Sequence, residues 1–447
     1  MSIKKAISAG LSLACVLANS LYLLPCEARA VANSKPTVKA AALTPQNKQP
    51  KSDKQEKPPL VEKYLLDGEL AAGEKALEAR LAEKSSDDQA RFGLGVLVFL
   101  QSVEGLIQDL HRYGFMDFED IPGPTRALKK VIAPNSNAEK LSYAGARQIV
   151  ERLRARLIKA ESTLSQINDD NVKLPLHFGM IKMDLSGGGV VQEDERLWKL
   201  FASVSGHTDI PEETAKNFYI KFDRGDVHWL QGYCHVLLTI CEVYLAHDSE
   251  ELFKRTAHLL FSNPDSPYLY LKSSAKKHKY HMGDMSFLDI IAFIHLINCK
   301  VVEPERMKTA LTHMEAVVTQ SRISWKYILA EKDDDHEWLP NPNQTGVIPN
   351  VKVTQEMVTS WAEVMNECER ILQGKALIPF WRGDDETLGI NLRKVMLEPR
   401  DFDLVLWVQG TAAAPYLEHG PISGRAKWST LTNDFGRNFP GFALWFN

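Results

Sequence analysis

Apolar residues recur every three or four positions through most of the chain after residue 60, which is the spacing of an amphipathic helix. This periodicity predicts helices over residues 69–83, 86–112, 138–167, 226–247, 250–260, 286–299, 304–331 and 354–373. Ser86 and Gln89 form a capping-box pattern at the start of the second helix. Gly374 follows the last helix as a C-cap residue.

Short alternating or β-branched apolar stretches interrupt the helical pattern. They predict strands at residues 172–184, 218–222, 376–381, 404–408 and 442–446. The expected fold class is mainly α with a smaller α+β C-terminal part, in which helical hairpins pack around long buried helices. We expect a helical hairpin domain over residues 61–170 and a mainly helical domain with short strands over residues 171–447.

The N-terminal residues 1–30 have the pattern of a bacterial-type signal peptide. Lys4 and Lys5 precede an apolar run, and Ala28 and Ala30 occupy the two positions that a signal peptidase recognises. An uncut membrane anchor is the alternative. Residues 31–60 are rich in Lys, Pro and Ala with almost no large apolar residue, so we expect a disordered linker. These features predict a periplasmic or secreted protein with no transmembrane segment after signal cleavage.

Composition narrows the classes of partner. The net charge is −4, a mildly acidic balance that gives no support to nucleic-acid binding. The expected partner is an unknown protein or small ligand in the envelope. Four of the six cysteines lie outside the signal, namely Cys234, Cys241, Cys299 and Cys368. Four are too few for a disulfide framework in so long a chain, so we expect buried thiols, with one long-range bridge as the alternative.

One stretch near the start of the body resembles a helical repeat unit. The residues that carry the resemblance are Gly68, Ala76, Leu77, Asp87, Asp88, Ala90, Leu94 and Gly95. With the two helices predicted over residues 69–112, they resemble a tetratricopeptide-type helical hairpin. No second copy follows at the period of roughly 34 residues, and a solenoid needs several such units. The resemblance covers about residues 66–112 and implies helix-hairpin architecture alone.

The stretch DLSGGGVVQEDE at residues 184–195 has the spacing of a calcium loop. Asp184 and Glu195 stand at positions 1 and 12, Ser186 at position 3, and Val190 at position 7, where a backbone carbonyl is used. The stretch resembles a degenerate EF-hand-like loop, because glycine stands at position 5 and a predicted strand replaces the entering helix. The resemblance implies that Asp184, Ser186, Val190 and Glu195 would ligate Ca²⁺. A glycine turn that leads into a helix is the alternative.

The predicted helix over residues 226–247 is apolar around most of its circumference, as buried helices are. Its polar residues fall on one stripe at steps of three and four and include no Lys or Arg: His228, Gln231, Gly232, His235, Thr239 and Glu242. Such a stripe indicates polar groups that face an internal pocket. With Asp289 of the helix over residues 286–299, it gives a candidate acid–base group of His235, Glu242 and Asp289. Histidines hydrogen-bonded within a helical core are the alternative.

The sequence contains no G-x-S-x-G, H-E-x-x-H, C-x-x-C or Walker pattern. The leading hypothesis is therefore a ligand-binding or protein-binding scaffold protein of the cell envelope that catalyses nothing. An envelope hydrolase with a His/carboxylate pocket is one alternative. A calcium-stabilised structural protein built around Asp184 and Glu195 is the other.

Overall fold

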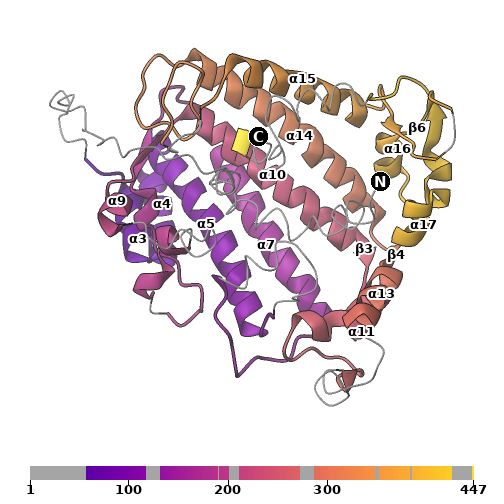
Figure 1. Cartoon of the computed structure of the whole chain (residues 1–447). Coiled ribbons are helices and arrows are strands. Elements are labelled where there is room, and N and C mark those ends of the chain that lie inside the picture. The colour runs from indigo at the N-terminus through magenta and orange to yellow at the C-terminus, as the bar shows by residue number, and fades with distance from the viewer. Residues whose placement is uncertain are drawn as a thin grey trace, which may run out of the picture.

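The computed structural model describes residues 57–116, 131–189, 191–200, 211–271, 286–347, 352–382, 385–424 and 445–446. Within these residues the chain is mainly helical and carries three small antiparallel sheets (Figure 1). The fold is therefore mainly α with a smaller α+β C-terminal part, as the hydrophobic periodicity predicts. The predicted signal peptide and nearly all of the predicted linker, up to residue 56, lie outside the described residues.

Long helices form the body of the molecule. In chain order they are α3 (Leu60–Asp67), α4 (Leu70–Glu83), α5 (Asp88–Arg112), α7 (Tyr143–Leu164), α10 (Arg224–Ala246), α14 (Pro304–Ala330) and α15 (Gln355–Leu372). Each of them contacts the next one along the chain. Figure 1 shows α5, α7, α10 and α14 side by side. The central helix α10 is therefore flanked by α7 and α14.

Short elements gather at the edges of this body. They are α9 (Glu212–Lys216), α11 (Glu250–Leu260), α13 (Ser286–Leu296), α16 (Leu392–Leu397) and α17 (Leu404–Gln409), with 3₁₀ turns at η2 (Phe178–Met180), η3 (Glu193–Glu195) and η4 (Thr411–Tyr416). In Figure 1, α11, α13 and α17 follow one another along the right-hand side. The helices α11 and α17 both contact α13.

The strands are two to four residues long and pair antiparallel throughout. They are β1 (Leu174–Leu176), β2 (Ile220–Phe222), β3 (His247–Asp248), β4 (Asn298–Val301), β5 (Ile378–Pro379), β6 (Leu388–Ile390), β7 (Phe402–Asp403) and β8 (Leu417–His419). The sheet orders are β1-β2, β3-β4-β7 and β5-β6-β8. In the second sheet Cys299 lies opposite Phe402. Because β3 follows α10, β4 follows α13 and β7 precedes α17, this sheet joins the edge helices to the end of α10.

Two apolar cores hold the helices together. The first includes residues from Val61 to Cys241 and joins α3, α4, α5, α7 and α10. The second joins α14 and α15 and includes Trp445 and Phe446. The helix α5 is long and apolar enough to cross a membrane, but 67% of its most apolar 18-residue stretch is buried within the molecule. Core helices often have this length and apolar composition.

The hairpin region over residues 61–170 shares its apolar core with α10.

Side-chain caps fix where the long helices begin. The Asp87 carboxylate accepts the backbone N–H of Ala90 at 3.2 Å at the start of α5, one residue after the Ser86 that the sequence pattern favours. The Ser142 hydroxyl accepts the N–H of Gly145 at 3.0 Å at the start of α7. Each cap satisfies one backbone donor that the first turn of a helix leaves without an intrahelical partner.

The apolar run at residues 404–408 is a helix, so the predicted strand there was wrong. Asp403 accepts the N–H of Leu406 at 2.9 Å and caps α17, and Gly410 ends the helix with a φ of 107°. A short apolar run is compatible with either a strand or a buried helix. Here Asp403 caps the start of a helix and Gly410 caps its end, so the run is helical. The predicted strands at residues 172–184 and 376–381 are shorter than expected, as β1 and β5. Residues 442–444 of the last predicted strand lie outside the described part.

The four cysteines after residue 30 are thiols, in agreement with the expectation of thiols in place of a disulfide framework. Cys234, Cys241 and Cys299 are buried and Cys368 is partly buried. Burial raises the pKa of the Cys368 thiol to about 11, so that thiol is protonated at neutral pH.

Candidate functional site

The polar stripe of α10 lies inside the molecule. His228, Gln231 and Glu242 are buried, and His235 and Thr239 are partly buried. Because α10 packs against both α7 and α14, these side chains meet polar side chains of the two neighbouring helices. We call this set of stripe residues and their partners on α7 and α14 the polar seam. This position agrees with the prediction that the polar stripe faces the interior. The contacts of each side chain then determine whether it can act as an acid, a base or a ligand.

At the N-terminal end of the polar seam, His228 is held by two residues of α14. Its Nδ1 lies 2.7 Å from Oε1 of Gln320, and its ring stacks on the Tyr327 ring at an interplanar angle of 10°. Burial lowers the pKa of His228, so the imidazole is neutral at pH 7. This histidine is therefore hydrogen-bonded within the helical core.

In the middle of the polar seam, His235 meets His313 of α14 and Glu161 of α7. The two Nδ1 atoms are 3.0 Å apart, and Nε2 of His235 lies 3.7 Å from Oε1 of Glu161. Gln231 donates to the same Glu161 oxygen at 3.2 Å. Burial lowers the pKa of both imidazoles, and the His235 charge lowers that of His313 further. Sequence reasoning named His235 and missed His313, which lies in an ordinary amphipathic helix pattern.

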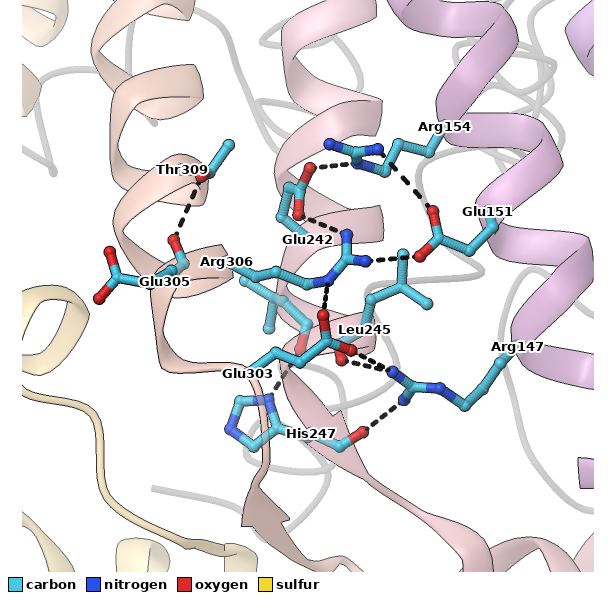
Figure 2. A network of polar contacts seen from close by, with 11 residues as sticks. Arg147, Glu151, Arg154, Glu242, Leu245, His247, Glu303, Glu305, Arg306 and Thr309 are labelled. Atoms are coloured by element: carbon cyan, nitrogen blue, oxygen red, sulfur yellow. Dashed lines mark hydrogen bonds and ion pairs between the residues drawn. The ribbon is translucent and has the colours of Figure 1, made fainter. Parts of the chain in front are cut away.

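At the C-terminal end of the polar seam, Glu242 is enclosed by two arginines. Its side chain is 1% exposed, and its two oxygens accept from Nε of Arg154 and, at 3.1 Å, from Nη1 of Arg306 (Figure 2). Arg154 comes from α7 and Arg306 from α14, so Glu242 joins three helices. A carboxylate that is 1% exposed and enclosed by two arginines is out of reach of a substrate.

The ion pairs around Glu242 extend to the end of α10. Arg306 also donates to Glu151 at 2.6 Å and to Glu303 at 2.7 Å. Arg147 donates to Glu303 and to the backbone carbonyls of Leu245 and His247, each at 2.8 to 2.9 Å (Figure 2). Three arginines thus balance the three glutamates Glu151, Glu242 and Glu303. The carbonyl contacts also satisfy backbone acceptors that the last turn of α10 leaves open.

The structure does not bring the predicted acid–base group together. Asp289 lies on α13, next to α11, where burial raises its pKa and His258 partly offsets that effect. His235 and Glu242 are seven residues apart on α10, which is roughly 10 Å along the helix axis. Within the described residues, His235 contacts Glu161 and His313, and Glu242 contacts arginines. The three residues therefore belong to three separate environments.

The predicted calcium loop turns its two acidic side chains toward its own backbone. The Asp184 carboxylate accepts the N–H groups of Gly188 and Gly189 at 3.1 and 2.8 Å, and the Ser186 hydroxyl at 3.4 Å. Glu195 accepts three N–H groups, those of Leu185, Ser186 and Gln192, at 2.7 to 3.2 Å. Val190 lies outside the described residues. In this arrangement backbone donors occupy the carboxylate lone pairs that a cation would use.

A third carboxylate, which sequence reasoning missed, lies behind the same loop. Oε1 of Glu104, on α5, accepts the N–H of Asp184 at 2.7 Å. Burial, together with the charges of Asp184 and Glu195, raises the pKa of Glu104 to about 7. Glu104 therefore titrates near neutral pH.

A second group that sequence reasoning missed lies at the start of α10. One carboxylate oxygen each from Asp223, Glu331 and Glu337 lies within 4.8 Å of the others, and we call these three residues the acidic cluster. Asp223 caps α10, Glu331 follows the last residue of α14, and Glu337 is in the next loop. Oxygen ligands at this spacing are the type that Ca²⁺, Mg²⁺ and Mn²⁺ prefer. In the sequence, the capping pattern of Asp223 with Asp226 indicates a helix start, but it does not indicate that Glu331 and Glu337 lie nearby.

Protons neutralise part of the charge of the acidic cluster. Lys173 and Lys221 pair with Asp333 and Asp335 at 2.6 and 2.7 Å, and the Lys173 charge partly offsets the raised pKa of Glu337. Burial and the Asp223 charge raise the pKa of Glu331 to about 10 and that of Glu337 to about 7. At neutral pH the acidic cluster therefore holds at least one proton. Gln344 donates to Glu331 at 3.0 Å and holds this side chain in place.

Comparison with known proteins gives no relative for this chain. No protein-family model matches it, no curated protein matches it, and no solved structure matches it. The functional argument therefore rests on the residues and their geometry.

Proposed function

We propose that this protein is an exported binding protein of the cell envelope that docks a protein partner on a surface formed by α13 and α17. The residues that carry the proposal are exposed and apolar: Leu288, Ile291, Trp381, Val405, Leu406 and Val408. We call them the α13–α17 surface. Each is between 46% and 50% exposed, and neighbouring exposed apolar residues typically mark an interaction site.

The composition of α13 supports this proposal. Its apolar residues face every direction around the helix: Leu288, Ile290, Ile291, Phe293, Ile294 and Leu296. Helices that are apolar all round are normally buried. No described side chain of α13, over residues 288–296, is buried in this chain. A second molecule would supply the missing cover.

The short helix α17 and Trp381 extend the apolar area. Val405 and Val408 are one turn apart on α17, and Trp381 donates its Nε1–H to the carbonyl of Val408 at 3.0 Å. Trp381 therefore lies against the end of α17 while its ring stays exposed. Tryptophan is among the residues that contribute most to binding at protein interfaces.

The shape and polarity of α13 favour a protein partner over a lipid surface. Eleven residues span roughly 16 Å, about half of the hydrocarbon thickness of a bilayer. A helix that lies in a membrane interface needs a charged face that stays in water. Asp289 is the one acid of α13, and the helix contains no Lys or Arg. A protein groove or helix can enclose apolar side chains on more than one side, as this composition requires.

The polar seam supports binding over hydrolysis. Both oxygens of Glu242 are ion-paired within the chain, and Nδ1 of His235 faces another histidine. A hydrolase would need one of these groups directed at a substrate. The geometry of the polar seam therefore supports the binding hypothesis more than the hydrolase hypothesis.

Site-specific photo-crosslinking in the producing cells tests this proposal. A photoreactive amino acid would replace Ile291 in one strain and Leu406 in another, and Thr319, exposed on α14, in a control strain. We expect the same partner protein from the first two positions and not from the third. The purified partner should then bind the unmodified chain and lose at least tenfold in affinity for Ile291→Asp, but not for Thr319→Asp.

Three results would contradict the proposal. A crosslink between two copies of this chain would make the surface a self-association interface. Binding of the chain to lipid vesicles that is lost in Ile291→Asp would make the occupant a membrane. Equal crosslinking at all three positions would show that the surface has no specific partner.

A further inference from the structure

The contact between His235 and His313 is unusual within the polar seam because it joins two side chains of the same type. Their Nδ1 atoms are 3.0 Å apart and their ring centroids 5.2 Å apart. A neutral imidazole has one N–H and one lone pair. Without a further group between them, one Nδ1 must donate to the other. Both Nδ1 atoms can instead direct lone pairs at one shared ion.

The geometry suits a shared metal ion. A metal about 2.1 Å from each nitrogen, the usual distance for Zn²⁺ and imidazole, would subtend an N–metal–N angle of roughly 90° at the observed separation of 3.0 Å. That angle is the one between neighbouring ligands in square-planar and octahedral coordination, and Cu²⁺ and Ni²⁺ favour such geometries. A modest separation of the two rings would give the tetrahedral angle of Zn²⁺.

The surroundings of the pair approach the arrangement that accompanies histidine ligands, with a carboxylate near the other ring nitrogen of His235 but beyond hydrogen-bond distance. Such a histidine normally directs its other ring nitrogen at a carboxylate, which fixes the ring and its tautomer. Here Nε2 of His235 lies 3.7 Å from Glu161, and Gln231 holds the same Glu161 oxygen at 3.2 Å. With its proton on Nε2, His235 presents the lone pair of Nδ1 to His313. Glu242 is engaged by arginines, so Glu161 is the carboxylate that serves the pair.

We propose that His235 and His313 bind a late first-row divalent metal ion, of the class Cu²⁺, Ni²⁺ or Zn²⁺, through their two Nδ1 atoms. Glu161 orients His235 from the outer shell, and water completes the coordination. Neutral imidazole is the state that binds metals. The ion would join the central helix α10 to α14. This site is independent of the α13–α17 surface and of any partner that binds there.

Metal titration of the full chain and four variants tests the proposal. The variants are His235→Gln, His313→Gln, Glu161→Gln and, as a matched control, His228→Gln. His228 lies two turns before His235 on α10 and is hydrogen-bonded to Gln320, so its loss leaves the proposed site intact. The readouts are the shift in unfolding temperature with Zn²⁺ and Ni²⁺, the affinity and stoichiometry by calorimetry, and the EPR spectrum of bound Cu²⁺.

We expect one ion per chain, a higher unfolding temperature with metal, and a Cu²⁺ EPR spectrum with coupling to two imidazoles. His235→Gln and His313→Gln should each abolish these effects. Glu161→Gln should weaken binding by roughly 10- to 100-fold, and His228→Gln should leave it unchanged. If the two imidazole variants do not fold, the imidazole count in the Cu²⁺ spectrum of the unmodified chain decides the question.

Two results would overturn the assignment. An unchanged unfolding temperature with every metal, together with a Cu²⁺ spectrum that lacks two-imidazole coupling, would leave the pair as an N–H···N hydrogen bond. Equal loss of binding in His228→Gln and His235→Gln would place the ion elsewhere in the chain.

Discussion

The polar seam and the α13–α17 surface distribute polar and apolar side chains in opposite ways. The polar seam places charged and hydrogen-bonding groups between α7, α10 and α14, where several of them are buried. The α13–α17 surface places aliphatic residues and Trp381 in contact with solvent. Burial of a charge costs free energy unless the charge is paired, whereas exposure of an apolar group costs little in the folded chain but favours association.

The difference separates residues that maintain the fold from residues that are available to other molecules. At the C-terminal end of the polar seam, three glutamates meet three arginines, so the charges balance within the chain (Figure 2). Among the residues that the structure describes, the apolar groups of the α13–α17 surface stay about half exposed. The two regions therefore give opposite expectations for mutation, namely large changes in stability for the first and changes in binding for the second.

The largest effect is expected from Glu242→Ala. Removal of this buried carboxylate leaves three arginines facing the two remaining glutamates, Glu151 and Glu303, and loss of one partner of a buried ion pair typically costs about 3–5 kcal/mol. Because Arg154 and Arg306 keep some contact with water, we expect a loss near the low end, about 3 kcal/mol in the free energy of unfolding. Urea denaturation at pH 7 measures it, and Glu242→Gln should recover part of the loss because its amide oxygen still accepts a hydrogen bond.

Glu303→Ala provides the matched control for this prediction. Glu303 pairs with the same Arg306 but is 45% exposed, and exposed ion pairs contribute less than about 1 kcal/mol. Losses of equal size at Glu303 and Glu242 would show that burial does not distinguish the polar seam from ordinary surface charge. The contrast between the two regions would then lose its energetic basis.

An intermediate effect is expected from the acidic cluster, whose three carboxylates, unlike Glu242, pair with no arginine among the described residues. The pKa of Glu337 is raised from 4.5 to about 7, so the folded chain holds a proton there that the unfolded chain releases. The resulting stability is complete below about pH 4.5 and is lost progressively as the pH rises to about 7. Replacement of Glu337 by Gln should remove this loss and make the protein more stable by about 1–3 kcal/mol at pH 8.

Urea denaturation across pH 5 to 8.5 compares wild type with Glu337→Gln, with chelator present so that no divalent cation neutralises the acidic cluster. Glu363→Gln, an exposed acid on α15, is the control and should follow wild type at every pH. Parallel curves for wild type and Glu337→Gln would show that Glu337 ionises equally in the folded and unfolded chain. Its burial between Asp223 and Asp333 would then have no effect on stability.

Sequence periodicity was sufficient for the long helices and for the burial of the α10 stripe. A helix that is apolar on most of its circumference must be enclosed, and α10 begins and ends within two residues of the predicted bounds. The fold class followed from the same pattern. The short run at residues 404–408 was assigned wrongly because five apolar residues in a row fit both the period of a helix and the period of a strand. The caps Asp403 and Gly410 distinguish the helix from the strand.

The partners of the α10 stripe could not be predicted because they come from distant parts of the chain. His313 and Glu161 are about 78 and 74 positions from His235, and no local pattern sets which residues of α7 and α14 face it. The acidic cluster likewise joins a helix start to a loop more than a hundred residues later. The spacing of polar residues along one helix shows which of them share a face. Which residues of the neighbouring helices meet that face depends on how the helices pack.

The smallest effect on stability is expected on the α13–α17 surface. Ile291→Ser removes an apolar side chain that is already 49% exposed, so the free energy of unfolding should change by less than about 0.5 kcal/mol. Leu311→Ala, in the core at 3% exposure on α14, should lose about 2–5 kcal/mol in the same urea experiment. A loss in Ile291→Ser comparable to that of Leu311→Ala would show that this chain itself buries Ile291 in solution. The residue would then belong to a core, and α13 would have no apolar surface left for a partner.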